Sequence, residues 1–264
     1  MKKSLFILLL AAFTMPAQSQ TVNDLLNQAN NLLNGGNSNQ NSNGKATLGN
    51  SNQGVAGLLG GNLSNTEIVG GLKEALRIGT QNASGKLGVL NGFFGNQLIK
   101  ILLPQEVRQA EATLRQFGFA KQCDKLILSL NRAAEDAAGK AVPIFVNAIT
   151  SMSINDGLSI LLGGNNAATE FLKHTTTGAL TSAFRPVIEK SLGKVGATRY
   201  WTDFFTLYNR LPITRQKVNA DLPAYVTDRA LHGLFTTVAQ EELNIRQNPG
   251  ARVTDLLRKV FGGK

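Results

Sequence analysis

Apolar residues recur every three or four positions along most of this chain, which is the spacing of an amphipathic helix. The pattern predicts a helix over residues 120–138 and a longer one over 222–247. The residues expected to face inward from these two helices are Leu126, Ile127, Leu130, Ala133, Ala134, Ala137, Leu231, Leu234, Phe235, Val238 and Ile245. No strand-like alternation of useful length appears. The pattern therefore predicts an all-α fold.

Helix start signals divide the chain further. Ser64 and Glu67 form a capping box, in which each side chain satisfies a backbone amide of the other residue, and an apolar stripe follows from Ile68 to Leu76. Ser153 and Asp156 are predicted to cap another helix in the same way.

Prolines and glycines mark further boundaries. Pro104 suits the first turn of a helix that Gly118 ends, and Pro143 opens a short helix to about residue 151. Gly163 stops the helix that Ser153 caps. Pro186 lies inside a long helical segment, where we expect a break or a kink.

The last helix is predicted to begin near Asn248 and Pro249 and to have an apolar stripe through Val260. Its basic residues are expected on a solvated face opposite that stripe; they are Arg252, Arg258 and Lys259. We interpret the segment as a terminal helix that packs on the core, in preference to a membrane-active one.

The first residues have the features of a secretory signal. Lys2 and Lys3 precede a short apolar run, and small residues precede an expected cleavage between Ser19 and Gln20. The run is too short for a membrane anchor, and no later stretch of the mature chain is long and apolar enough to span a bilayer. We therefore expect a soluble periplasmic or otherwise exported protein.

The mature chain is expected to begin with a tethered segment. Residues 21–34 have helical apolar spacing, and residues 35–62 form a Gly/Asn/Ser-rich tract that we interpret as a flexible linker. We expect the short helix to dock on its own domain. The alternative is an arm that docks on another chain or on a membrane, and the membrane is the weaker version because the polar face has no basic residue. The predicted organisation is a signal peptide over 1–19, the helix and linker over 20–62, and a compact multi-helix domain over 63–264.

Composition narrows the classes of partner. The chain has 42% hydrophobic and 17% charged residues, as in ordinary globular proteins, and a formal charge of +10, or +8 without Lys2 and Lys3. Basic and acidic residues are interleaved, without a basic block or a basic and aromatic stacking pattern, so a nucleic-acid partner is excluded. A modest attraction to anionic envelope surfaces is compatible with this charge. Cys123 is the only cysteine, so no intramolecular disulfide forms.

Several motifs together resemble an exported bacterial family catalogued as domain of unknown function 4197. They are GLKEAL (71–76), LSLNRAAE (128–135), PIFVNAI (143–149), YVTDRALHGLF (225–235) and the closing stretch. The resemblance covers about residues 64–262. It implies a compact helical domain in the cell envelope and no particular activity. Similar sequences tend to have Asp at the position of His232 and a basic residue near His174, which argues against an essential role for the two histidines.

The preferred candidate site is a set of polar residues beside apolar stripes on two helices. Asn131, Arg132 and Glu135 flank one stripe, and Asp228, Glu242 and Arg246 flank another. If the two helices meet, these residues form a partly buried network or line a polar pocket. The structural interpretation, an ion-pair network that fixes packing, is favoured over a functional one.

Three kinds of chemistry are weaker candidates. Glu170/His174 and Asp228/His232 have i, i+4 spacing and together offer a metal four ligands, but helical metal bundles use Glu-x-x-His and more carboxylates. Cys123 is a nucleophile only if Lys121 and Lys125 lower its pKa and a histidine lies near. The glycine-rich loops at 85–95 and 163–166 are better explained as helix stops and caps than as phosphate sites. We therefore expect no cofactor, no metal and no catalytic residue.

Three functions compete. The first is a non-catalytic exported protein that binds an envelope partner. The second is a soluble carrier of a small amphipathic ligand in a cavity between helices. Its lining would be drawn from Phe184, Tyr200, Trp201, Phe204, Phe205 and Tyr208. The third, an enzyme that uses Cys123 or a histidine–carboxylate metal site, ranks last.

Overall fold

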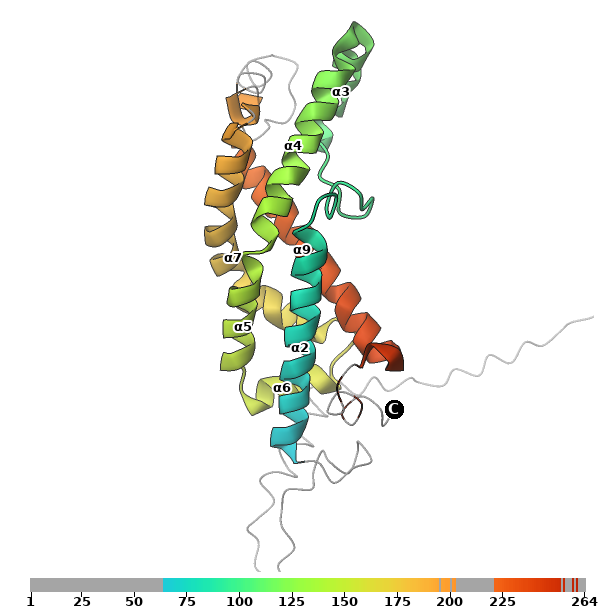
Figure 1. The fold of residues 1–264 in the computed structure, drawn as a ribbon, viewed down its shortest axis with the longest axis vertical. Helices are drawn as coiled ribbons and strands as arrows, with labels where there is room; N and C mark the ends of the chain where they lie inside the picture. Colours follow the sequence, from blue (N-terminus) through green and yellow to red (C-terminus); the bar gives the residue numbers. More distant parts are fainter. Residues whose placement is uncertain are drawn as a thin grey trace, which may run out of the picture. The chain divides into compact units, whose positions relative to one another are not determined.

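A computed structural model describes residues 64–194, 196–199, 201–202, 221–252, 254, 258 and 260. Within these ranges the α-helices are α2 (Asn65–Leu87), α3 (Arg108–Leu114), α4 (Ala120–Ala138), α5 (Ala141–Ser151), α6 (Ile154–Leu162), α7 (Ala167–Lys194) and α9 (Leu222–Gln247). Shorter helical turns are η2 (Gln105–Val107), η3 (Arg115–Phe119) and η4 (Pro249–Ala251). These ranges contain no strand, and the predicted all-α class is confirmed (Figure 1). The predicted signal peptide, short helix and linker lie outside the described residues.

Helix α2 begins at the predicted capping box. The Glu67 amide donates to the Ser64 hydroxyl, and the Ser64 amide donates to the Glu67 carboxylate. The apolar stripe from Ile68 to Leu76 is buried, and it packs against α9, α5 and α6. The contact with α6 is close, because a Cβ on Gly157 would lie 2.7 Å from a methyl group of Val69.

Helices α3 and α4 form a hairpin whose turn is η3. Gly118 has φ 88°, a left-handed conformation that glycine adopts without steric cost, and it separates the two helices as predicted. The bounds of α4 equal the predicted range, and five of its six predicted inward residues are buried, while Leu126 is half-buried.

Helix α6 confirms the second predicted capping box. The Asp156 amide donates to the Ser153 hydroxyl, and the Asp156 carboxylate accepts from the Ser153 amide. No single helix in the described ranges is long and apolar enough to cross a membrane; α5 and α6 pass that test only as a joined pair bent by 104°.

Helix α7 is continuous through Pro186, so the predicted break does not occur, and the alternative of a kink stays a prediction. Proline removes one backbone donor and crowds the preceding turn. Here Phe184 and Ile188, on either side of Pro186, are fully buried, and the helix packs against α4, α5 and α9. Burial of both flanking turns offsets the local cost.

Helix α9 is central to the core. It crosses behind α2 and α4 in Figure 1 and packs against α7, α2 and α4. All five residues predicted to face inward from it are buried. The largest buried side chains nearby include Trp201, which stacks on Tyr225 with ring centroids 5.8 Å apart. Trp201 and Phe184, two of the residues proposed to line a ligand cavity, are buried in the core. The other four residues of that set lie outside the described ranges.

Arg252 is not solvated, in contrast to the prediction. It is buried, and its guanidinium donates to the carbonyls of Ile245 and Arg246 at 3.2 and 2.9 Å. These carbonyls lie in the last turn of α9, where helical acceptors lack intrahelical partners. Arg252 therefore caps α9, whereas Arg258 is exposed as predicted.

Candidate functional site

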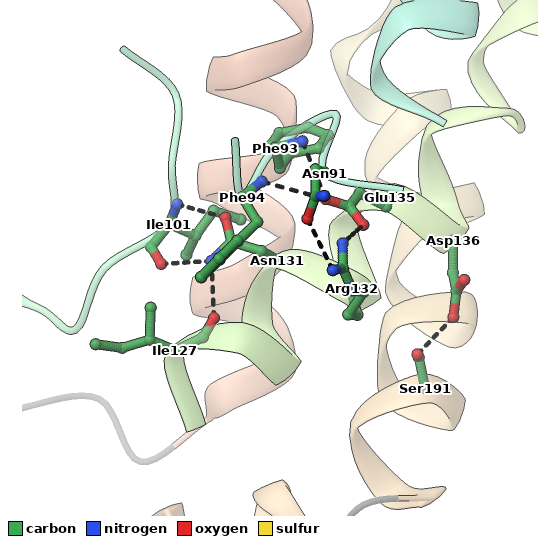
Figure 2. A network of polar contacts seen from close by, with 10 residues as sticks. All are labelled: Asn91, Phe93, Phe94, Ile101, Ile127, Asn131, Arg132, Glu135, Asp136 and Ser191. Carbon is green, nitrogen blue, oxygen red and sulfur yellow. Dashed lines mark hydrogen bonds and ion pairs between the residues drawn. The ribbon is translucent and has the colours of Figure 1, made fainter. Parts of the chain in front are cut away.

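Asn131 fixes the segment between α2 and α3 to α4. Its side-chain amide accepts from the Ile101 amide and donates to the Ile101 carbonyl, both at 2.8 Å, and it also donates to the Ile127 carbonyl (Figure 2). The side chain is completely buried. Asn131 thus gives hydrogen-bond partners to the backbone N–H and C=O groups of Ile101, which is itself buried.

Glu135 and Arg132 fix the same segment one turn further along α4. One carboxylate oxygen of Glu135 accepts from the amides of Phe93 and Phe94 at 3.1 and 3.2 Å. The other oxygen pairs with Arg132, whose guanidinium also donates to the Asn91 side chain at 2.9 Å (Figure 2). We call residues 88–104 the anchored loop, and Asn131, Arg132 and Glu135 the loop clamp.

The anchored loop has a backbone that few sequences allow. Asn91 has φ 68°, and a Cβ on Gly92 would lie 2.5 Å from the carbonyl oxygens of Lys86 and Leu87. The fully buried Phe93 ring approaches α9 so closely that a Cβ on Gly233 would lie 2.5 Å from it. The loop is therefore held from two helices, α4 and α9.

The anchored loop buries some of its apolar residues and exposes others. Its buried residues are Phe93, Ile99, Ile101 and Leu103. Its exposed large apolar residues are Val89, Leu90, Leu98 and Leu102. Leu90 and Leu98 are each 73% exposed. We call the exposed group the loop surface.

Glu242 and Arg246 form a second cluster at the start of α7. The Glu242 carboxylate accepts from the amides of Ala168 and Thr169 at 3.0 and 2.8 Å and from the Thr169 hydroxyl. Arg246 pairs with Glu242 at 2.9 Å and donates to the Ile160 carbonyl near the end of α6. We call this pair the helix clamp. Because Glu242 already supplies an anion to these N-terminal amides, the 163–166 loop serves as a helix junction.

The six predicted site residues do not form one network. Helices α4 and α9 do meet, but among the described residues no hydrogen bond joins the loop clamp to the helix clamp. Asp228 belongs to neither cluster: it is exposed and lines a groove of about 520 Å³ between α7 and α9. Helical spacing identified five residues with buried partners, but it did not show which segment each would hold.

The histidine–carboxylate set is only partly assembled. Glu170, Asp228 and His232 line the α7–α9 groove, and His174 is not among its lining residues. In the described part of the chain, no group of three His, Cys, Asp or Glu side chains is placed to hold a metal ion. The groove is open, and its lining exposes more apolar than polar surface.

Cys123 is buried, and this burial raises the pKa of its thiol. The Arg115 guanidinium lowers the pKa in part, while the carboxylates of Glu111 and Asp124 raise it further. The suggestion that Lys121 and Lys125 activate this thiol is therefore wrong; both lysines are exposed. A raised pKa reduces the thiolate fraction that nucleophilic catalysis requires.

Sequence reasoning missed two residues that hold the site. Glu241 is buried and binds Lys86 at the end of α2, next to the anchored loop. Asn91 supplies both the left-handed turn and an acceptor for Arg132. The Asn91-Gly92 pair, a common turn signal, pointed to the turn, but nothing in the spacing pointed to its partner.

The family model described as "Protein of unknown function (DUF4197)" matches residues 62–262, and the chain belongs to this family. No curated protein and no solved structure matches the chain. Within the matched range, the motif LSLNRAAE contains the whole loop clamp, and YVTDRALHGLF contains Gly233, against which Phe93 packs.

Proposed function

We propose that this chain is an exported, non-catalytic envelope protein that acts by binding a partner macromolecule, and that the loop surface is where the partner binds. The observation that carries the proposal is the pairing of two features. Four exposed apolar side chains lie on one loop, and three buried or partly buried polar side chains hold that loop in place. Exposed apolar groups that cluster on a fixed backbone are typical of interaction sites.

The rigidity of the anchored loop supports binding. Ordering a flexible loop on association lowers affinity, because its conformational entropy is lost at that step. The loop clamp and Phe93 fix the backbone of the loop in advance. The buried and exposed sides of the same segment then have separate roles: the first attaches the loop, and the second presents Val89, Leu90 and Leu98.

A partner at this surface is testable by site-specific photocrosslinking in the native envelope. A photoreactive residue replaces Leu90 or Leu98 in the full chain, and Leu162, which is also exposed and apolar but lies on α6, is the matched control position. We expect a discrete crosslinked product from the loop positions and none of the same mass from position 162. Absence of a product at both loop positions, or the same product at all three, would contradict the proposal.

The Asn131→Ala variant tests whether a fixed loop conformation matters for binding, apart from direct contact with the partner. Asn131 is completely buried and does not reach the partner, but its loss frees Ile101 and loosens the loop. We therefore expect a weaker crosslink from Leu90 and Leu98 in a variant that is still folded by circular dichroism. An unchanged crosslink yield in that variant would show that loop rigidity has no role.

A further inference from the structure

The turn of the α3–α4 hairpin exposes two aromatic side chains. Phe117 is 75% exposed and Phe119 is 47% exposed, and none of the residues of η3 is buried. Gly118 between them has φ 88°, which reverses the chain and places the two phenylalanines at the turn. Nothing lies within 4 Å of a Cβ built on Gly118, so the backbone at this point is open to its surroundings.

The charges of the hairpin are arranged unevenly. Arg115 pairs with both Glu111 and Asp124, each at 2.8 Å, so its single positive charge balances one of these two carboxylates. Arg108, Lys121 and Lys125 are exposed, and no described carboxylate forms an ion pair with them. Residues 108–125 have four cations and two carboxylates, so this segment has a net charge of 4 − 2 = +2.

The spacing of these groups fits the depth profile of a lipid interface. With a rise of about 1.5 Å per residue, Lys121 and Lys125 lie about 3 and 9 Å behind Phe119 along α4. Because they are four residues apart, they share one face of the helix. An apolar tip that enters the boundary between headgroups and acyl chains leaves such cations at the level of lipid phosphates.

A protein partner fits the tip less well than a bilayer does. Specific protein interfaces bury about 800 Å² on each side, and two rings on a sharp turn provide only a fraction of that area. A bilayer needs no complementary pocket, because the acyl chains flow around the inserted rings. Helix α3 packs mainly on η2, η3 and α4, whereas α4 packs on α7 and α9 and so attaches the hairpin to the core.

We propose that the tip of the α3–α4 hairpin binds anionic lipid bilayers, with Phe117 and Phe119 inserted and Arg108, Lys121 and Lys125 at the headgroups. This interaction uses different residues from the loop surface and does not depend on the partner proposed there. It places the protein at a membrane surface.

Vesicle sedimentation of the full mature chain tests this inference. The probes are vesicles of phosphatidylcholine alone and vesicles that also contain phosphatidylglycerol. We expect binding to the anionic vesicles that weakens as salt rises, since exposed charges are screened. Phe117→Ser and Phe119→Ser should each weaken it about tenfold. Lys121→Gln and Lys125→Gln should each weaken it about fivefold.

Two control variants match these changes. Leu162→Ser removes an exposed apolar side chain on α6, and Lys140→Gln removes an exposed cation just beyond the other end of α4; both should bind within about twofold of the wild type. Failure of the wild-type chain to bind anionic vesicles would overturn the proposal. So would full binding by the double Phe117→Ser/Phe119→Ser variant, because the tip would then have no part in it.

Phe117→Trp gives a second readout that does not depend on a loss of binding. Trp201, the only tryptophan, is buried, so its emission should stay nearly constant. The new indole should shift to shorter wavelength and be quenched by brominated acyl chains when anionic vesicles are added. If the protein is bound but the emission of the new indole stays at the wavelength seen in water, the tip is not inserted and the proposal is overturned.

Discussion

The loop clamp and the helix clamp have the same set of interactions but hold different kinds of segment. In each, one buried glutamate accepts two successive backbone amides and pairs with an arginine one turn away. Glu242 and Arg246 together join the start of α7 to the end of α6 within the helical core. Glu135 instead holds an irregular loop whose other side is exposed and apolar. A buried ion pair is therefore not by itself a sign of function; the segment that it holds, and the exposure of that segment, distinguish the two cases.

Glu242→Ala should have the largest effect. It leaves the Arg246 guanidinium, whose side chain is 10% exposed, without its carboxylate, and it uncaps two amides of α7. Loss of one partner of a buried pair costs about 3–5 kcal/mol. Urea unfolding followed by circular dichroism measures this loss. A change below about 1 kcal/mol would show that water replaces the carboxylate.

Glu135→Ala should cost less, about 2 kcal/mol, and its effect should be local. The Arg132 side chain is 31% exposed, so it reaches water when its partner is removed, and mainly the amides of Phe93 and Phe94 lose an acceptor. Hydrogen exchange should rise in residues 91–101 while α2 and α7 stay protected. Exchange that rises equally in all helices would mean that the two clamps do not differ in kind.

Ser153→Ala tests an exposed form of the same contact between carboxylate and amide. Loss of this cap should cost about 1 kcal/mol at neutral pH. Hydrogen bonds from the Ser153 hydroxyl and amide lower the pKa of Asp156. The stability from this carboxylate is thus fully present above the unfolded pKa of about 3.9 and is lost as pH falls through the lower folded pKa. The difference between wild type and variant should narrow near pH ~2; a constant difference would exclude the carboxylate as its source.

Asp228→Ala should have the smallest effect, within about 0.5 kcal/mol, because the side chain is exposed in the α7–α9 groove and belongs to neither clamp. Thermal unfolding measures it. Asp221→Ala is the control at the start of the same helix: Asp221 caps α9 and pairs with Arg185, so its loss should cost more. An equal loss at both positions would place Asp228 in a network after all.

The fold was more predictable than the site, for a physical reason. The bounds of α4 and α9 and both capping boxes follow from contacts within a few residues, which spacing in the sequence records. The clamps depend on pairs far apart along the chain, such as Glu135 with Phe93 and Glu242 with Thr169. Periodicity identifies Glu135 and Glu242 as polar residues beside a core stripe, but their partners are backbone amides, which leave no mark in the sequence. Pro186 is the opposite case: the local rule favours a break, but α7 continues through this position, where tertiary burial of both flanking turns opposes the break.

The packing of Phe93 against Gly233 fixes when the loop surface can form. A chain made from its N-terminus has the anchored loop early, but Glu135 follows 42 residues after Phe93, and Gly233 follows about 140 residues after it. Until α9 has been synthesised and has packed in place, Phe93 has no Gly233 to pack against, and the loop has no fixed conformation. The proposed binding surface is therefore among the last features to appear, so a chain cut short before α9 would have the loop sequence but would not display the surface.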